Sequence, residues 1–254
     1  MIFDSHAHYN DRAFDEDFME LLGSMEENNV GKIMNACSKL SEMEKIKSLC
    51  DTFSFMYGSV GIHPDSAEVI TPQTEKAIKD WTSEEKILAI GEIGLDYYYE
   101  EIPREIQKQC FDSQLSIAEE LGLPVIIHDR EAHKDSLEIA ASHKGITGVF
   151  HCFSGSKEMA REVLDLGLYV AFGGSLTFKN NVKTVEVAKY VPLDKIVVET
   201  DCPYLTPVPY RGKRNSSLYL KYVVEKIAEI KGISPREVET ATYENACRLF
   251  NIAR

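Results

Sequence analysis

The sequence predicts a single (β/α)8 barrel, the TIM-barrel fold, with an extra helix at its C-terminal end. Its 254 residues match the usual length of such a barrel, about 250 residues. Eight short apolar segments alternate with amphipathic segments along the whole chain, as expected for parallel strands joined by helices. The glycine-rich phosphate motifs GxGxxG and GxxxxGK[ST] are absent, which disfavours an open nucleotide-binding sheet. No linker or repeat divides the chain, so we expect residues 1–254 to form one domain.

The individual elements follow from the spacing of apolar residues. The predicted strands are 1–6, 30–36, 54–62, 86–92, 123–128, 146–151, 168–173 and 195–200. The predicted helices are 14–29, 41–52, 72–82, 103–121, 131–144, 156–167, 181–190, 216–232 and 234–250. Ser234 and Pro235 are typical N-cap and first-turn residues and place the start of the last helix.

Charge and composition limit the possible partners. Lys and Arg number 28 against 41 Asp and Glu, so the net charge is −13 and nucleic acid is repelled at long range. A polyanionic substrate would therefore have to be held by local cations or by metal. The six cysteines form no CxxC pair and the N-terminus does not read as a signal peptide, so we expect reduced thiols and a cytoplasmic location. No apolar run approaches the roughly 18 residues of a membrane span.

Ionisable residues fall at the ends of five predicted strands. They are His6, His8, Glu92, His128, His151, Glu199 and Asp201. Side chains two apart on a strand face the same way, so His6 and His8 should point together. Because parallel strands of a barrel end on one face, all these groups are expected at the C-terminal end, where TIM-barrel active sites lie.

Four imidazoles and three carboxylates in one small volume would suffer desolvation and mutual repulsion. A divalent metal ion resolves this, and nitrogen and oxygen ligands suit Mg²⁺, Mn²⁺ or Zn²⁺. Seven groups are too many for one tetrahedral ion, which favours two ions that share a carboxylate. A lone HxH pair or buried histidine is usually structural, so the prediction depends on the joint placement. Glu199 could instead orient a neighbouring ligand.

Several segments match a known family in order. The chain resembles the TatD family of metal-dependent deoxyribonucleases, which belongs to the amidohydrolase-like barrels. The matching segments cover nearly the whole chain, and the last is the most specific: DSHAH (4–8), GIHPD (61–65), GEIGLDYYY (91–99), PVIIHDREAHKD (124–135), FHCFSGS (150–156), FGGSLTFKN (172–180) and VETDCPYLTPVPYRGKRN (198–215).

The resemblance implies a set of site residues. One ion would be held by His6, His8, Glu92 and Asp201. The other would be held by Glu92, His128 and His151, with Glu92 as the bridge. Glu199 matches the glutamate of the ETD motif, which some members place near a third metal, and His63 matches a histidine near the substrate phosphate. The family usually continues RGKRN with Glu-Pro, whereas Ser216 and Ser217 stand here and leave the next helix start open.

Phosphate contacts have weaker support. Arg211, Lys213 and Arg214 put three cations in four residues after the last strand, a region that often binds phosphate in TIM barrels. We expect a phosphate clamp, although most short charge runs are solvated loops. His63 could likewise simply end a strand. Tyr204 and Tyr210 are possible stacking partners for bases.

The resemblance implies a deoxyribonuclease connected with DNA repair, which acts on single strands as a 3′-to-5′ exonuclease. Two metal ions would activate a water molecule, with Asp201, Glu92 and Glu199 as catalytic residues. An amide or ester hydrolase, such as a D-aminoacyl-tRNA deacylase, fits the same ligands, because metal polarises carbonyl and phosphoryl oxygens alike. A third alternative is a metal-bound interaction protein without catalysis, which the intact ligand set disfavours. Nucleic acid ends are the expected partner, with no obligate protein partner, and the native metal stays open.

Overall fold

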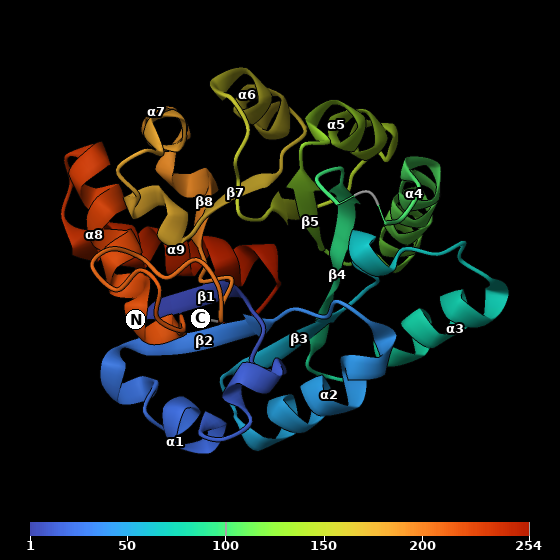
Figure 1. Ribbon diagram of the computed structural model, residues 1–254, viewed down its shortest axis with the longest axis horizontal. Helices are drawn as coiled ribbons and strands as arrows, with labels where there is room; N and C mark the ends of the chain where they lie inside the picture. Colours follow the sequence, from blue (N-terminus) through green and yellow to red (C-terminus); the bar gives the residue numbers. More distant parts are fainter. Residues whose placement is uncertain (100, 254) are drawn as a thin grey trace.

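Eight parallel strands form one sheet in sequence order, which confirms the predicted barrel (Figure 1). The computed structural model describes residues 1–99 and 101–253. The strands are β1 Ile2–Ala7, β2 Val30–Asn35, β3 Met56–Val60, β4 Ile87–Asp96, β5 Val125–Arg130, β6 Gly148–Phe150, β7 Tyr169–Phe172 and β8 Ile196–Val198. Their carboxyl ends share one end of the barrel, here called the mouth.

Helices surround the strands in the order that the sequence predicts (Figure 1). They are α1 Phe18–Gly23, α2 Met43–Thr52, α3 Pro72–Trp81, α4 Arg104–Leu121, α5 His133–Ser142, α6 Lys157–Asp165, α7 Val182–Tyr190, α8 Leu220–Lys231 and α9 Pro235–Leu249. No helix of the described residues is long and apolar enough to cross a membrane.

The predicted helix 14–29 is wrong as one element. The structure has a 3-10 turn at Arg12–Phe14, the short α1, and a second 3-10 turn at Glu26–Asn28. α1 ends at Gly23, followed by Ser24, and both residues have modest helix propensity. The left-handed backbone of Asn29 then ends the segment just before β2. The local sequence therefore favours three short pieces over one helix.

Strand β4 is longer than predicted, so the expectation that Glu92 ends its strand is wrong. β4 continues to Asp96, because Ile93 and Leu95 are fully buried and extend the apolar pattern. Gly94 lies inside this extension at φ 142°, where a Cβ atom would stand 2.0 Å from the backbone oxygen of His128. Glycine is the residue that this close approach of β4 to β5 permits.

The start of α8 also differs from the prediction. The helix begins at Leu220 rather than 216, after a 3-10 turn at Ser217–Tyr219, and Ser216 makes no side-chain capping bond. Ser217 does not cap the helix, because its hydroxyl donates to the buried carboxylate of Asp4. The helix start that the two serines left open is therefore explained by the contact of Ser217 with a residue 213 positions away in the sequence.

That carboxylate helps to join β8 to β1, where the barrel closes. Asp4 accepts hydrogen bonds from the amide and the hydroxyl of Thr200, at 2.9 and 2.7 Å. Alongside, the hydroxyl of Ser5 donates to the carbonyl of Val198, and the amide of Asp201 donates to the carbonyl of His6. These bonds fix Asp201 relative to His6 at the mouth.

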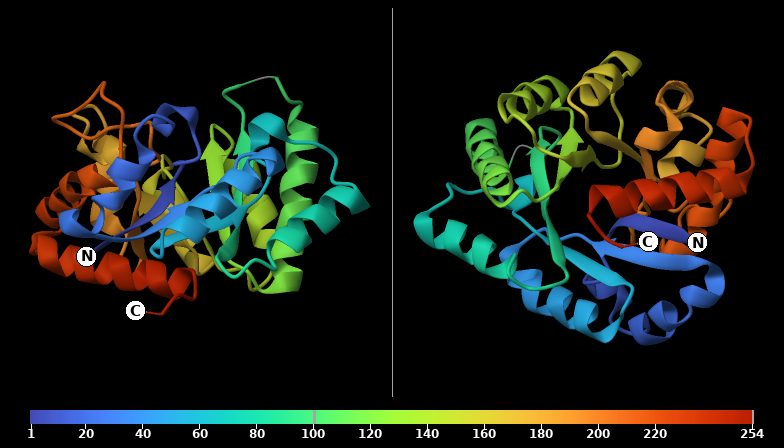
Figure 2. Two further views of the ribbon diagram at one scale, coloured as in Figure 1. Left: turned by 90° about the horizontal axis from the view of Figure 1, so that it is seen from below. Right: turned by 180° about the vertical axis from the view of Figure 1, so that it is seen from behind.

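Helix α9 covers the opposite end of the barrel (Figure 2). Its start is confirmed as predicted: Ser234 and Glu237 form a capping box, with Pro235 in the first turn. Its apolar residues and one residue from each of seven strands form the lower layer of the barrel interior. That layer consists of Phe3, Met34, Ala89, Ile126, Val149, Ala171, Val197, Ala246, Cys247, Leu249 and Phe250.

Candidate metal centre

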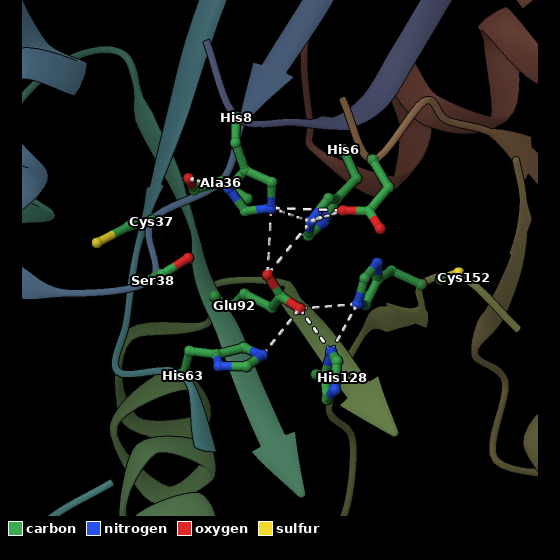
Figure 3. A network of polar contacts seen from close by, with 12 residues as sticks. His6, His8, Ala36, Cys37, Ser38, His63, Glu92, His128 and Cys152 are labelled. Carbon is green, nitrogen blue, oxygen red and sulfur yellow. Dashed lines mark hydrogen bonds and ion pairs between the residues drawn. The ribbon is translucent and has the colours of Figure 1, made fainter. Parts of the chain in front are cut away.

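Glu92 lies between two groups of histidines, and each of its carboxylate oxygens faces one group (Figure 3). Oε2 lies 3.3 Å from Nε2 of His6 and 3.5 Å from Nε2 of His8. Oε1 lies 2.7 Å from Nδ1 of His128 and 2.8 Å from Nε2 of His151. Glu92 is 3% exposed, so its carboxylate contacts the cluster rather than solvent.

The first group also contains Asp201. The Nε2 atoms of His6 and His8 are 3.0 Å apart, and Oδ1 of Asp201 lies 3.8 and 3.6 Å from them. Nδ1 of His8 donates to the carbonyl of Ala36 at 3.1 Å, which leaves its Nε2 lone pair directed at the cluster. The expectation that the HxH pair points together is confirmed by this geometry.

The second group is oriented by a residue that the sequence analysis missed. Nε2 of His128 donates to Oδ2 of Asp96 at 3.3 Å, so Nδ1 is left free to face Glu92 and His151. Asp96 is held in turn by the amides of Tyr98 and Tyr99. Its position at the end of β4 was hidden because the strand was predicted to stop at Glu92.

Distances within the first group fit a shared ion. A tetrahedral ion with bonds of about 2.1 Å separates its ligand atoms by roughly 3.4 Å. The nitrogen and oxygen atoms of the first group lie 3.0 to 3.8 Å apart. Two sets able to hold an ion are His6, His8 and Glu92, and His63, Glu92 and His128. The residues present therefore fit a bound metal ion, and the second of these sets contains His63 where the prediction has His151.

The electrostatics agree with that assignment. Burial alone would raise the pKa of Glu92, but the charges of His151, His63 and His6 hold it well below its ordinary value. Burial opposes protonation of His8, yet the Asp201 and Glu92 carboxylates raise its pKa to about 10. The same carboxylates would favour a metal cation, which must displace any proton on a ligand nitrogen.

Glu199 lies behind the cluster rather than beside Asp201. It is fully buried, its Oε1 accepts from the amide of Cys152, and that oxygen lies 3.7 Å from Nδ1 of His151. Within the described part of the chain, Nδ1 of His6, Nδ1 of His151 and Oε2 of Glu199 are buried without a hydrogen-bond partner. This placement fits both alternatives for Glu199, as a residue beside His151 that orients it and as a ligand of a further ion with His6 and His151.

The predicted phosphate contacts are placed in different settings. His63 lies against the centre, with Nε2 3.5 Å from Oε1 of Glu92, and its Nδ1 also caps the turn at Asp65. Arg214 forms a two-pronged ion pair with Asp17, at 2.8 and 2.5 Å. The guanidinium of Arg211 stacks on Phe178 at 3.9 Å. The three cations are thus not equivalent, because Arg214 is already paired.

Replacement of Asp96 by asparagine is expected to weaken metal binding about 10–100-fold, as loss of a ligand-orienting carboxylate typically does. The amide can accept only through one oxygen, so His128 is held less firmly in its tautomer. Metal competition titration measures the effect. The matched control is Asp135→Asn on α5, which alters a carboxylate bonded to Tyr97 and Lys108. Equal affinities in the two variants would contradict an orienting role for Asp96.

This fold and cluster define the class of TIM-barrel proteins that carry a metal centre at the barrel mouth. The profile of the family described as TatD related DNase matches residues 3–251. The chain therefore belongs to the TatD family, and within it to the metal-dependent hydrolases.

Relatives and solved structures agree over the whole length. The metal-dependent hydrolase YabD of Bacillus subtilis is 41% identical, covering 99% of this chain and 100% of its own. The 3′-5′ ssDNA/RNA exonuclease TatD of Cronobacter sakazakii is 28% identical, covering 98% of this chain and 97% of its own. The crystal structure of the TatD homologue YJJV from Escherichia coli K12 superposes with a TM-score of 0.92 at 26% identity, covering 99% and 98% of the two chains.

Proposed function

We propose that this protein is a metal-dependent exonuclease that releases nucleoside 5′-monophosphates from the 3′ end of single-stranded DNA. The observation that carries the proposal is the position of Glu92 between two histidine groups, which would suit two adjacent cations. The relative from Cronobacter sakazakii, named a 3′-5′ ssDNA/RNA exonuclease, supports the choice of substrate. We propose a cytoplasmic location for this activity.

We assign the first site to His6, His8, Glu92 and Asp201, and the second to Glu92, His128 and His151. When bound there, two divalent ions would activate water and neutralise the charge that develops on the phosphoryl oxygens. The native ion is Mg²⁺, Mn²⁺ or Zn²⁺ on the chemistry of these ligands.

The side chains of the protein supply position and proton transfer. Asp201 is the most accessible carboxylate of the cluster, with 19% of its side chain exposed, and its lowered pKa leaves it ionised at neutral pH. Burial opposes that ionisation, and the contact with His8 together with the charges of His6 and His151 outweighs it. We assign to Asp201 the transfer of the proton from the attacking water. His63 faces Oε1 of Glu92 and is placed to contact a phosphate held at the second site.

One experiment separates this function from its main rival. A single preparation with a single metal is offered a 3′-labelled oligonucleotide, a D-aminoacyl-tRNA and a simple lactone. The oligonucleotide is expected to turn over fastest, and Asp201→Asn is expected to abolish that turnover while circular dichroism shows a folded barrel. Faster turnover of either other substrate, lost in Asp201→Asn while a nuclease trace persists, would show that the nuclease reading is wrong.

The cations after β8 give a second measurable expectation. Reversal of charge in Arg211→Glu with Lys213→Glu is expected to raise KM for oligonucleotides about tenfold and to reduce the salt slope by about one per residue. Arg214→Glu should act mainly on stability, because it breaks the ion pair with Asp17. Lys76→Glu on the outer face of α3 is the control for net charge. An unchanged KM and salt slope in the double variant would make this segment a solvated loop.

A further inference from the structure

A cavity of about 310 Å³ opens directly beside the second metal group. Two of its lining side chains contact that group: His63 faces Oε1 of Glu92, and Asp96 holds His128. The remaining wall comes from the segment after β4, including Tyr99, and from the first turn of α4. A ligand phosphate at the second site would therefore have its next chemical group at the entrance of this cavity.

The wall of the cavity is held in place by hydrogen bonds. Gln107 accepts from the amide of Asp96 and donates to the carbonyls of Asp96 and Ile102. Asp96 accepts from the amides of Tyr98 and Tyr99, so both ends of the segment are tied to α4 and β4. Figure 3 shows His63 and His128 on the same side of Glu92. A preformed cavity of this kind favours a rigid ligand.

The charge of the lining excludes one class of ligand. Three acidic residues line the cavity, namely Asp65, Asp96 and Glu101, while the described lining residues include no lysine or arginine. A second phosphate or a carboxylate would be repelled here. A neutral, flat group that carries N–H donors is the ligand that fits.

We propose that this cavity is the subsite for the base of the 3′-terminal nucleotide, and that it selects bases with an exocyclic amino group. This inference rests on the proposed nuclease function. Tyr99 and Ile102 provide a ring and an apolar side chain for the faces of the base. The amino groups of cytosine, adenine and guanine can donate to the carboxylates, whereas thymine and uracil carry a carbonyl oxygen, which the carboxylates repel, at the position of the cytosine amino group.

The kinetic test compares oligonucleotides that differ only in the last base. Cytosine and uracil have the same ring size, so dC and dU ends isolate the amino group from stacking. The manganese-loaded protein is expected to show at least a fivefold higher kcat/KM for the dC end than for the dU end. Glu101→Gln should reduce that ratio at least twofold, and Tyr99→Ala should lower kcat/KM at least fivefold for every base.

Tyr190→Ala on α7 and Glu158→Gln on α6 are the matched controls, because both side chains lie outside the cavity. Both should leave the dC to dU ratio unchanged. Equal rates for the dC and dU ends would overturn the proposed selection by carboxylates. Normal kcat/KM in Tyr99→Ala would overturn the stacking wall, and with it the subsite.

A binding measurement keeps this inference separate from the nuclease function. Equilibrium dialysis with dCMP and dUMP, using the manganese-loaded protein, reports the subsite without any turnover. Preferential binding of dCMP that is lost in Tyr99→Ala supports the subsite even if no oligonucleotide is cleaved, in which case the nuclease proposal alone fails. Cleavage of oligonucleotides with equal affinity for dCMP and dUMP would leave the nuclease standing and refute the subsite.

Discussion

Glu92→Gln is expected to reduce kcat by roughly 10³-fold or more, since a bound metal supplies several kcal/mol of transition-state stabilisation. One side chain faces both histidine groups, so this single change weakens both sites, whereas loss of His8 or His128 weakens one. The amide is neutral, and its nitrogen presents hydrogens toward one of the two groups. Metal content per chain and kcat, measured on the same preparation, test the expectation.

Glu158→Gln is the control for this change, because the side chain lies on α6 outside the centre. It should retain full metal content and activity. If Glu92→Gln keeps the metal content of the unmodified protein and more than a tenth of its kcat, Glu92 does not join the two sites.

Gly94→Ala is expected to have the largest effect on stability, about 3 kcal/mol or more of unfolding free energy. The new methyl group would stand 2.0 Å from the carbonyl oxygen of His128, at a φ of 142° that side chains rarely adopt. Gly94 is paired with His128 in the register of β4 and β5, so relief of the overlap must separate these strands. For a chain of this size, 3 kcal/mol corresponds to a fall in Tm of about 10 °C.

The matched change is Gly23→Ala, at the end of α1. A Cβ atom there meets nothing within 4 Å, and alanine is the better helix former, so stability should be unchanged or slightly higher. Denaturant unfolding compares the two variants. A Gly94→Ala protein as stable as the Gly23→Ala protein would show that β4 and β5 are not held together as closely as the structure places them.

Much of the fold could be predicted from the sequence because parallel strands are buried on both faces. Segments such as 125–127 are therefore continuous apolar runs, and histidines that follow them are placed at the mouth by the rule for barrel ends. Local patterns failed where glycine and polar residues occur inside a strand. The predicted strand ends at 92, before Gly94, yet β4 continues to Asp96.

Other features depend on contacts that no local pattern records. Asp96 orients His128 only because β4 extends beside β5, and Ser217 is bound to Asp4 across most of the chain. The pairing of Arg214 with Asp17 is equally distant in sequence. The cluster of cations after β8 was therefore read as one unit, although its members have different partners.

The position of helix α9 has a consequence for folding during synthesis. Phe250, directly after α9, packs against Phe3 of β1 with ring centroids 5.8 Å apart. The lower layer of the barrel stays incomplete until α9 has been synthesised, so the emerging chain exposes apolar strand residues to solvent and chaperones while the residues before α9 are added. At a few to about 20 residues per second, that interval is on the order of ten seconds or more. Premature termination before α9 would thus release a chain whose lower apolar layer is exposed, which makes it a target for cellular quality control.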